Sequence, residues 1–334
     1  MKQALLLCFS DRGEETAGKL ERFLREEYET RVIRPGHGQL SQVTKDGFEN
    51  AQILIYISSC GIAARAIAPY IVHKAQDPAV LVCDELGMHI IALLSGHIGG
   101  ANELTRMLAE KIGADPVITT ATDINKKFSA DAWAAKYGLH IDPLSAVKRF
   151  SSEILKRDLP MHCDFPVKGA LPGGTFADDH GDLGVCISTG TRRPFEETLL
   201  LVPKIVHVGI GCKRNAPIGD IRDAVTDALN RLCLHPASVA DLSSIDVKAN
   251  EAGILCLAKE MNVPFRTYSA SELNALNGSF TVSEFVRGTV GVDCVCERAA
   301  MLSAGAGGRL LLKKTKYTGV TCAVSIEDWR ACFE

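Results

Sequence analysis

The sequence lacks the features that mark membrane proteins, disulfide-stapled secreted proteins and zinc proteins. No apolar run approaches the ~20 residues of a membrane span, and the sequence leads us to expect no secretory signal peptide. The 12 cysteines form no CxxC pair, and the nearest two, Cys294 and Cys296, are most simply packing residues. Zinc sites need paired ligand spacings that are missing here. We therefore expect a cytoplasmic protein with reduced thiols, no metal ligands of its own and no membrane association.

A strong excess of charge is also missing. Lys and Arg number 37 against 40 Asp and Glu, a formal net charge of −3, which argues against a nucleic-acid-binding protein because these are usually basic. The chain contains neither a P-loop nor a full dinucleotide-binding fingerprint, so a nucleotide-binding enzyme is a weak alternative. A length of 334 residues with 46% hydrophobic and 23% charged residues fits a globular protein of about two domains.

Strand and helix patterns alternate along residues 1–138, which predicts a doubly wound α/β domain. Short apolar runs predict buried strands at 4–9, 53–57, 79–83 and 89–94. In such folds ligands bind beyond the carboxyl ends of the strands. We expect three loops of small residues to converge there and contact a substrate: Ser10, Ser59 to Gly61, and Gly96 to Asn102.

The stretch Gly96–Thr105 is the most informative of these loops. It follows a predicted strand and opens a predicted helix, so its glycines allow close backbone approach and the free amides of the helix start attract anions. His97 and Glu103 lie at the same turn, which would place acid–base chemistry beside anion binding. The alternative is a tight strand–helix connection with a solvated histidine.

A polar loop at residues 119–123 follows the next predicted strand. Thr120 and Thr122 are candidates for hydrogen bonds to a ligand. Asp123 is at least as well explained as a helix cap.

The remaining chain predicts a small β-rich middle region at 139–202 and a second doubly wound α/β domain at 203–334. The acidic run at 178–182 lacks the glutamate that closes a calcium loop, so we expect a solvated turn. Ser269 and Glu272 fit a capping box. A Gly-x-Gly turn after the strand at 205–210 predicts a carboxylate-binding loop, with solvated cations as the alternative. Its residues are Gly209, Gly211, Lys213 and Arg214.

Six runs of residues occur together in this chain. They are Gly96–Thr105, Gly209–Arg214, Ser244–Glu251, Pro264–Leu273, Phe280–Arg298 and Arg309–Val320. In combination they closely resemble the cobalt-precorrin-5A hydrolase family, the CbiG-type proteins of anaerobic cobalamin synthesis. The resemblance extends over nearly the whole chain, in the family's order of N-terminal, middle and C-terminal regions, with the middle region the least distinctive.

The resemblance implies an enzyme that acts on a cobalt-bearing, ring-contracted tetrapyrrole. Such hydrolases open the δ-lactone between the ring A acetate and the extruded carbon C-20, then expel that carbon with its methyl group as acetaldehyde. Cobalt arrives inside the substrate, so no cofactor is implied, and neighbouring methyltransferases of the pathway are the implied partners. The alternative is a non-catalytic corrinoid carrier, because the C-terminal region resembles stand-alone cobalamin-synthesis proteins without a clear reaction.

Lactone opening requires an activated water, donors for the oxyanion and an acid for the leaving alcohol. We assign His97 as the base, because an unperturbed imidazole pKa of about 6.5 suits proton transfer at neutral pH. Glu103 would orient His97 or protonate the leaving oxygen. We expect the amides of Gly99 and Gly100 to be the oxyanion donors and Asn102 to fix the substrate.

Overall fold

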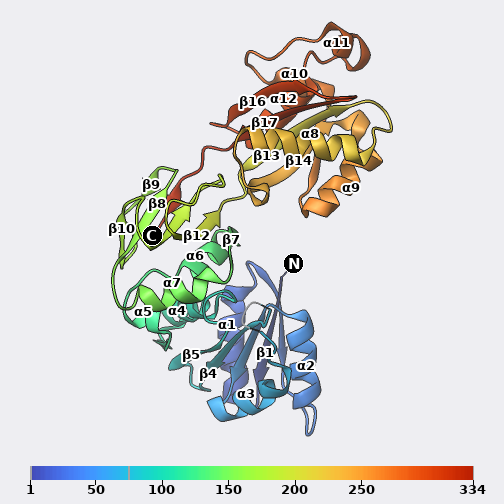
Figure 1. Ribbon diagram of the computed structural model, residues 1–334. Helices are drawn as coiled ribbons and strands as arrows, with labels where there is room; N and C mark the ends of the chain where they lie inside the picture. The colour runs from blue at the N-terminus through green and yellow to red at the C-terminus, as the bar shows by residue number, and fades with distance from the viewer. Residues whose placement is uncertain (1, 74–75, 334) are drawn as a thin grey trace. The chain divides into compact units, whose positions relative to one another are not determined.

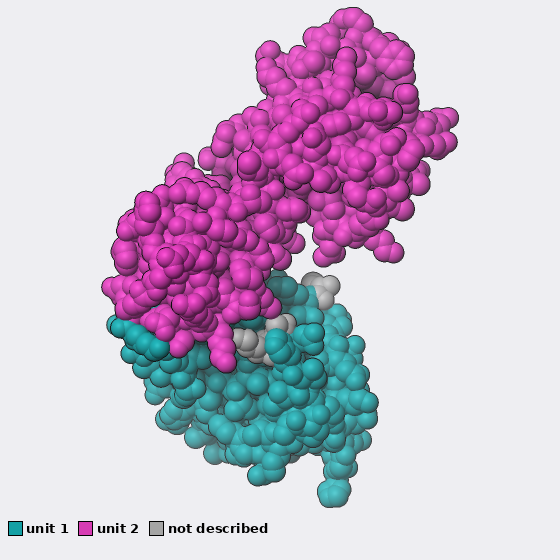
Figure 2. Space-filling model, in the orientation of Figure 1, with its two compact units in different colours: residues 1–137, 154–156 teal, residues 138–153, 157–334 magenta. Residues whose placement is uncertain are grey.

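The computed structural model describes residues 2–73 and 76–333, and the chain forms two compact units. Residues 1–137 with 154–156 make up the first unit, and residues 138–153 with 157–334 make up the second, as the two colours of Figure 2 show. The division into regions 1–138, 139–202 and 203–334 stays a prediction. Within the part of the chain that is described, no helix combines the length and the apolar character needed to cross a bilayer.

The first unit is built on a six-stranded sheet in the order β2-β1-β3-β4-β5-β6. The strands are β1 (Lys2–Cys8), β2 (Tyr28–Ile33), β3 (Ile53–Ile57), β4 (Ala79–Cys83), β5 (His89–Leu94) and β6 (Asp115–Val117). β1 to β4 pair in parallel, and β1, β3 and β4 are buried along most of their length, because helices cover both faces. β5 runs antiparallel to β4, and β6 runs parallel to β5.

The helices on both faces of this sheet confirm the predicted doubly wound architecture (Figure 1). α1 (Asp11–Leu24) and α4 (Ala101–Ile112) pack on one face through apolar residues spaced at helical intervals. α2 (Leu40–Asn50) and α3 (Cys60–Ile67) pack on the other. Two short helices, α5 (Ala121–Ile124) and α6 (Ala130–Lys136), come after β6.

A five-stranded sheet in the order β10-β8-β11-β12-β7 confirms the β-rich character expected of the middle region. Its strands are β7 (His140–Asp142), β8 (Leu159–Cys163), β10 (Thr175–Ala177), β11 (Leu183–Ile187) and β12 (Glu197–Val202). Helix α7 (Ala146–Glu153) contacts β11 and β12. A separate parallel pair joins β9 (Val167–Lys168) to β18 (Ala331–Cys332) near the end of the chain.

The C-terminal sheet has the order β15-β14-β13-β17-β16 and again carries helices on both faces. Its strands are β13 (Val206–Cys212), β14 (Val239–Ile245), β15 (Phe265–Tyr268), β16 (Arg309–Lys316) and β17 (Val320–Ile326). The helices are α8 (Ile218–Arg231), α9 (Ala252–Met261), α10 (Ala270–Ala275), α11 (Glu284–Val290) and α12 (Val295–Ala304). α8 and α9 cover one face and α12 covers the other.

Two local predictions are confirmed in this part of the chain. The Ser269 side chain accepts from the backbone amide of Glu272 while the Glu272 side chain accepts from the Ser269 amide, so the predicted capping box starts α10. All 12 cysteines are free thiols, and Cys294 and Cys296 are buried packing residues.

Candidate active site

The loop that carries His97 lies at the opposite edge of the first sheet from the one expected. β5 runs antiparallel to β4, so Leu94 at the end of β5 pairs with Val80 near the start of β4. The Ser95 hydroxyl donates to the backbone carbonyl of Asp77, which precedes β4, at 3.0 Å. The loop after β5 therefore lies beside the starts of the parallel strands.

For this reason the predicted convergence of three small-residue loops was wrong. Ser10, Ser59 and Gly61 follow the ends of β1 and β3, at the far edge of the sheet from His97. The Ser10 hydroxyl donates to Glu85 at 2.7 Å, and Ser59 and Gly61 form the start of α3. A substrate role for Ser59 and Gly61 would thus require a site separate from His97.

His97 lies between two aspartates. Its Nε2 is 3.1 Å from Oδ2 of Asp123, and its Nδ1 is 3.4 Å from Oδ1 of Asp131. The Thr122 hydroxyl is 3.1 Å from the same Nε2. This meeting follows from strand direction, because β5 and β6 are parallel and the segments after them reach one edge. The side chain of His97 is 20% exposed and that of Asp131 only 6%, so the imidazole is the more accessible of the two.

Asp123 forms hydrogen bonds and an ion pair with neighbouring side chains. Its Oδ2 accepts hydrogen bonds from Asn102 at 2.9 Å and from Thr120 at 2.5 Å, and its Oδ1 pairs with the Arg106 guanidinium. Asn102 also donates to the Thr120 hydroxyl at 2.8 Å. The structure thus brings together the predicted residues His97, Asn102 and Thr120. The view of Asp123 as a helix cap was wrong, because its carboxylate binds side chains of other segments.

Hydrogen bonds and ion pairs shift the pKa values of the ionisable groups in this cluster. Hydrogen bonds to Asp123 and Asp131 outweigh the opposing effect of burial and raise the pKa of His97 to about 9. Burial raises the pKa of Asp123, but hydrogen bonds from His97, Thr120 and Arg106 hold it well below its usual range. At neutral pH His97 is therefore an imidazolium. The premise of an unperturbed imidazole was wrong, and the base role of His97 stays a prediction.

The start of α4 is less open to anions than expected. Gly100 adopts a φ of 81°, which glycine tolerates without strain, and its amide donates to the His97 carbonyl at 2.9 Å. The amides of Ala101 and Asn102 donate to carbonyls earlier in the loop, at 3.1 and 3.0 Å. The assignment of Gly100 as an oxyanion donor was therefore wrong, since its N–H already has an acceptor within the loop.

Gly99 is required by packing. A Cβ atom at this position would lie 2.4 Å from the Cβ of Ser95, closer than two carbon atoms approach in a folded chain. Glycine at this position is thus needed for the backbone to pack against Ser95 within the loop. The role of Gly99 as an oxyanion donor stays a prediction.

Glu103 does not orient His97. Its carboxylate is 3.4 Å from Nζ of Lys136 and 3.8 Å from the Arg106 guanidinium, and its side chain is 64% exposed. The two aspartates occupy both ring nitrogens of His97, so the expected orienting role of Glu103 was wrong. Its alternative role as a proton donor stays a prediction.

Sequence reasoning missed Asp131 and misjudged Asp123. Asp131 stands in the first turn of α6, where an acidic residue ordinarily only stabilises the helix, so its position carried no sign of a contact with His97. The strand order could have predicted this contact, because polar residues that follow two neighbouring parallel strands come together at one edge of the sheet.

The raised pKa of His97 makes the stability of the first unit depend on pH. Protonation of His97 stabilises the fold fully below about pH 6.5, and this contribution is lost as pH rises through about 9. We expect a loss on the order of 2–3 kcal/mol across that window. The measurement is urea unfolding followed by Trp133 fluorescence in a Trp329→Phe background. In the matched variant with His97→Gln the decline should disappear, and an equal decline in both proteins would contradict the assignment.

The glycines of the C-terminal motif lie inside a strand. β13 continues through Cys212, so the predicted Gly-x-Gly turn was wrong. A Cβ atom on Gly209 would lie 1.9 Å from the carbonyl oxygen of Cys296 in α12, and one on Gly211 would lie 2.6 Å from Oγ1 of Thr321. Glycine is needed at 209 because the backbone of α12 packs directly on the strand.

Lys213 and Arg214 follow β13 with exposed side chains. Among the residues that the structure describes, no carboxylate lies within ion-pair distance of either cation. Their predicted role in binding substrate carboxylates stays a prediction.

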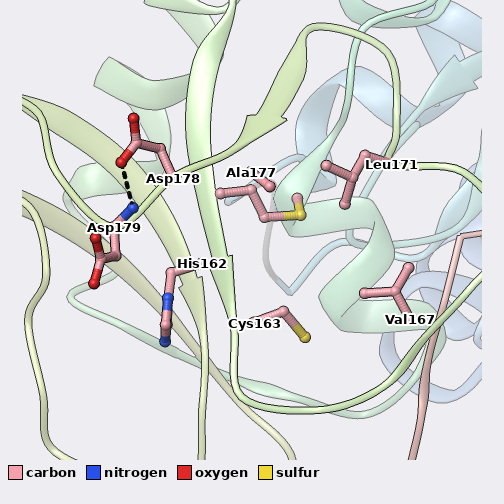
Figure 3. Close-up of a pocket in the computed structure, with 8 residues that line it drawn as sticks. His162, Cys163, Val167, Leu171, Ala177, Asp178 and Asp179 are labelled. Carbon is pink, nitrogen blue, oxygen red and sulfur yellow. Dashed lines mark hydrogen bonds between the residues drawn. The ribbon is translucent and has the colours of Figure 1, made fainter.

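A pocket of about 370 Å³ opens beside β8 in the middle sheet (Figure 3). His162 and Cys163 of β8 and the Asp178–Asp179 segment contribute to its wall. The Nε2 atom of His162 is 2.9 Å from Oδ1 of Asp164. None of the predicted site residues lines this pocket, so it adds nothing to the candidate active site.

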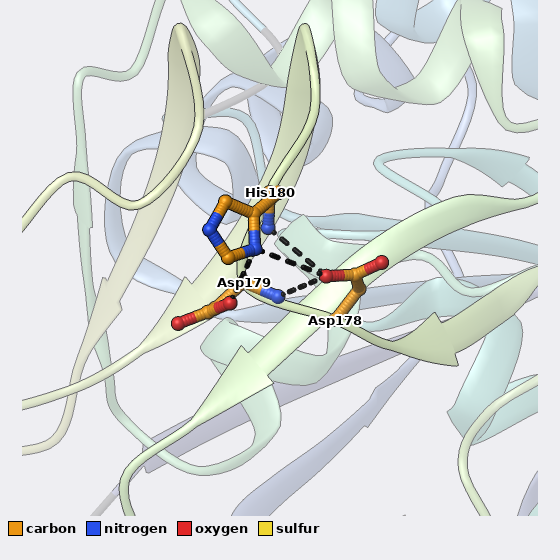
Figure 4. Close-up of side chains that lie close together, drawn as sticks. All are labelled: Asp178, Asp179 and His180. Carbon is orange, nitrogen blue, oxygen red and sulfur yellow. Dashed lines mark hydrogen bonds and ion pairs between the residues drawn. The ribbon is translucent and has the colours of Figure 1, made fainter.

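Asp178, Asp179 and His180 form an exposed cluster (Figure 4). Their ligand atoms lie within 4.8 Å of one another, the one such grouping found in residues 2–73 and 76–333. The His180 side chain is 86% exposed, and Asp179 is 2.8 Å from the Arg192 guanidinium, which competes with any cation for that carboxylate. The turn is therefore solvent-exposed, as predicted.

Comparison with known proteins gives matches along most of the chain. Residues 42–123 match the family model Cobalamin synthesis G N-terminal, and residues 206–325 match Cobalamin synthesis G C-terminus. A cobalt-precorrin-5A hydrolase of Salmonella typhimurium is 34% identical over 96% of this chain and 97% of its own. One from Priestia megaterium is 32% identical over 92% of this chain and 87% of its own.

Among solved structures, a cobalamin biosynthesis protein G homologue from Sulfolobus solfataricus aligns over 97% of both chains, with a TM-score of 0.44 and 21% identity. The N-terminal family model includes both His97 and Asp123. Because identity of 34% extends over nearly the full length of a relative, this chain belongs to the cobalamin synthesis G family, as its six sequence runs indicated.

Proposed function

We propose that this chain is a cobalt-precorrin-5A hydrolase of cobalamin biosynthesis. It opens the ring A δ-lactone of its substrate and expels C-20 as acetaldehyde, giving cobalt-precorrin-5B. Relatives with this name align over most of both chains, which supports the proposal. Cobalt enters as part of the substrate, so the reaction needs no cofactor held by the protein. The enzyme works in the cytoplasm beside the methyltransferases of the pathway.

The observation that carries the proposed site is the imidazolium of His97 between Asp123 and Asp131. Opening a lactone develops negative charge first on the carbonyl oxygen and then on the alcohol oxygen that leaves. A partly exposed imidazolium can stabilise both charges electrostatically, and the Nε2 proton that Asp123 holds can pass to the second. Asp131 then acts as a positioning residue, because it holds Nδ1 from the less exposed side.

In the first step of the proposed mechanism, His97 acts as an acid. Water adds its oxygen to the lactone carbonyl and the acyl–oxygen bond breaks. The C-20 oxygen takes a proton from His97, which regains one from the water that attacked. In the second step the C-20 hydroxyl gives its proton to solvent water and the bond from C-20 to the macrocycle breaks. The bonding electrons pass into the cobalt-bearing ring, and acetaldehyde leaves.

Acetaldehyde release by the purified full-length chain tests this function. Incubation with cobalt-precorrin-5A should produce one acetaldehyde per substrate, measured by NADH oxidation with added alcohol dehydrogenase. A matched reaction without the chain gives the spontaneous rate. Tight substrate binding without acetaldehyde above that rate would replace the enzyme with the corrinoid carrier.

A further inference from the structure

Three cations gather at the end of β13 in the C-terminal sheet. Lys213 and Arg214 follow this strand directly. Lys316 ends β16 and pairs in register with Thr321 of β17, which in turn pairs with Gly211 of β13. Strand register therefore brings cations from two distant segments of the chain to one edge of the sheet.

The Lys213 side chain is held along the turn between β16 and β17. Its backbone amide donates to the Gly319 carbonyl at 2.9 Å, and a Cβ atom added to Gly319 would lie 3.3 Å from Cδ of Lys213. The apolar stem thus packs on the turn while the side chain stays exposed. Gly319, with a φ of 72°, leaves the space for this stem.

The charged residues nearby that the structure describes do not form ion pairs with Lys213, Arg214 or Lys316. Lys248, just after β14, is already engaged, because its Nζ is 2.9 Å from Glu251 and both side chains are mostly buried. Asp246 is an exposed carboxylate at the same edge. Within the described ranges, no carboxylate lies within ion-pair distance of Lys213, Arg214 or Lys316. A local surplus of positive charge therefore stands on a chain whose formal net charge is −3.

We infer that this edge, Lys213 with Arg214 and Lys316, binds peripheral acetate and propionate carboxylates of the tetrapyrrole. The identity of the ligand rests on the proposed function. Arginine engages a carboxylate through two parallel hydrogen bonds, and lysine adds a point charge. The carboxyl ends of β13 and β14, which run in parallel, are also the edge where open α/β sheets bind ligands. The edge contributes affinity and takes no part in bond breaking.

The test measures binding of cobyrinic acid, a corrin with free carboxylates, and of its fully methylated ester. We expect the double variant Lys213→Gln, Arg214→Gln to raise the Kd for the acid about tenfold, and Lys316→Gln to raise it about threefold. Binding of the ester should not change. Lys259→Gln, an exposed lysine in the last turn of α9, is the control for general loss of charge.

An unchanged Kd for the acid in both variants would overturn the inference and leave these cations as solvated surface groups. An equal loss for the acid and the ester would also overturn it, because the effect would not depend on carboxylate charge. With the authentic substrate, the double variant should raise KM and leave the single-turnover rate unchanged. If the wild-type chain releases no acetaldehyde, the proposed function fails while the binding result still stands.

Discussion

A His97→Ala variant is expected to release acetaldehyde about 10²-fold more slowly than the wild type, or slower still. General acid–base groups contribute rate factors of this order, and His97 is the cation that the proposed mechanism uses as its acid. The measurement is single-turnover acetaldehyde formation with the protein in excess over cobalt-precorrin-5A. Because alanine leaves the buried Asp131 carboxylate without its cation, His97→Gln serves as a second variant that fills the same space.

The pH profile separates the acid role from a structural one. With a His97 pKa of about 9, the wild-type rate should fall as pH rises through that value. Asp131→Asn removes one of the two carboxylates that raise this pKa, so the falling limb should move to lower pH. His89→Ala, at the start of β5 with a side chain 52% exposed, should leave rate and profile unchanged. Near-normal turnover by folded His97→Ala protein would remove His97 from the mechanism.

Gly209→Ala is expected to destabilise the second unit by about 3 kcal/mol or more. The added Cβ atom would lie 1.9 Å from the Cys296 carbonyl oxygen and 2.9 Å from the Ala300 nitrogen, both backbone atoms of α12 that cannot rotate away. The helix must therefore move off the strand. The midpoint of urea unfolding, followed by Trp329 fluorescence in a Trp133→Phe background, measures the change.

Gly219→Ala is the matched control for this substitution. Gly219 lies in the first turn of α8, and a Cβ atom there meets nothing within 4 Å. Alanine is a better helix former than glycine, so stability should be unchanged or slightly higher. If Gly209→Ala were as stable as Gly219→Ala, the direct packing of α12 on β13 would be contradicted.

Local patterns predicted many elements well, because strands and caps depend on nearby residues. The apolar runs at 53–57, 79–83 and 89–94 match β3, β4 and β5 residue for residue. The capping box at Ser269 is equally local. The Gly-x-Gly motif was wrongly predicted to be a turn, because local sequence does not decide between its two uses. The same two glycines suit a turn or a strand packed closely against a helix.

The direction of β5 could have been derived from the sequence. Only residues 84–88 join β4 to β5, which is too short for the crossover that two parallel strands require. An antiparallel β5 moves His97 away from Ser59 and Gly61 and toward the loop after β6. The short connection between β4 and β5 therefore decides at which edge of the sheet His97 lies.

The sequence alone determined the family, the α/β class and the choice of His97, because these depend on motifs and local periodicity. Only the tertiary structure decided which groups surround that imidazole. Asp123 and Asp131 reach it through the parallel pairing of β5 with β6, and their charges convert an expected neutral base into a cation. The pKa of a side chain is set by neighbours in space, and these neighbours come from segments that no local pattern connects.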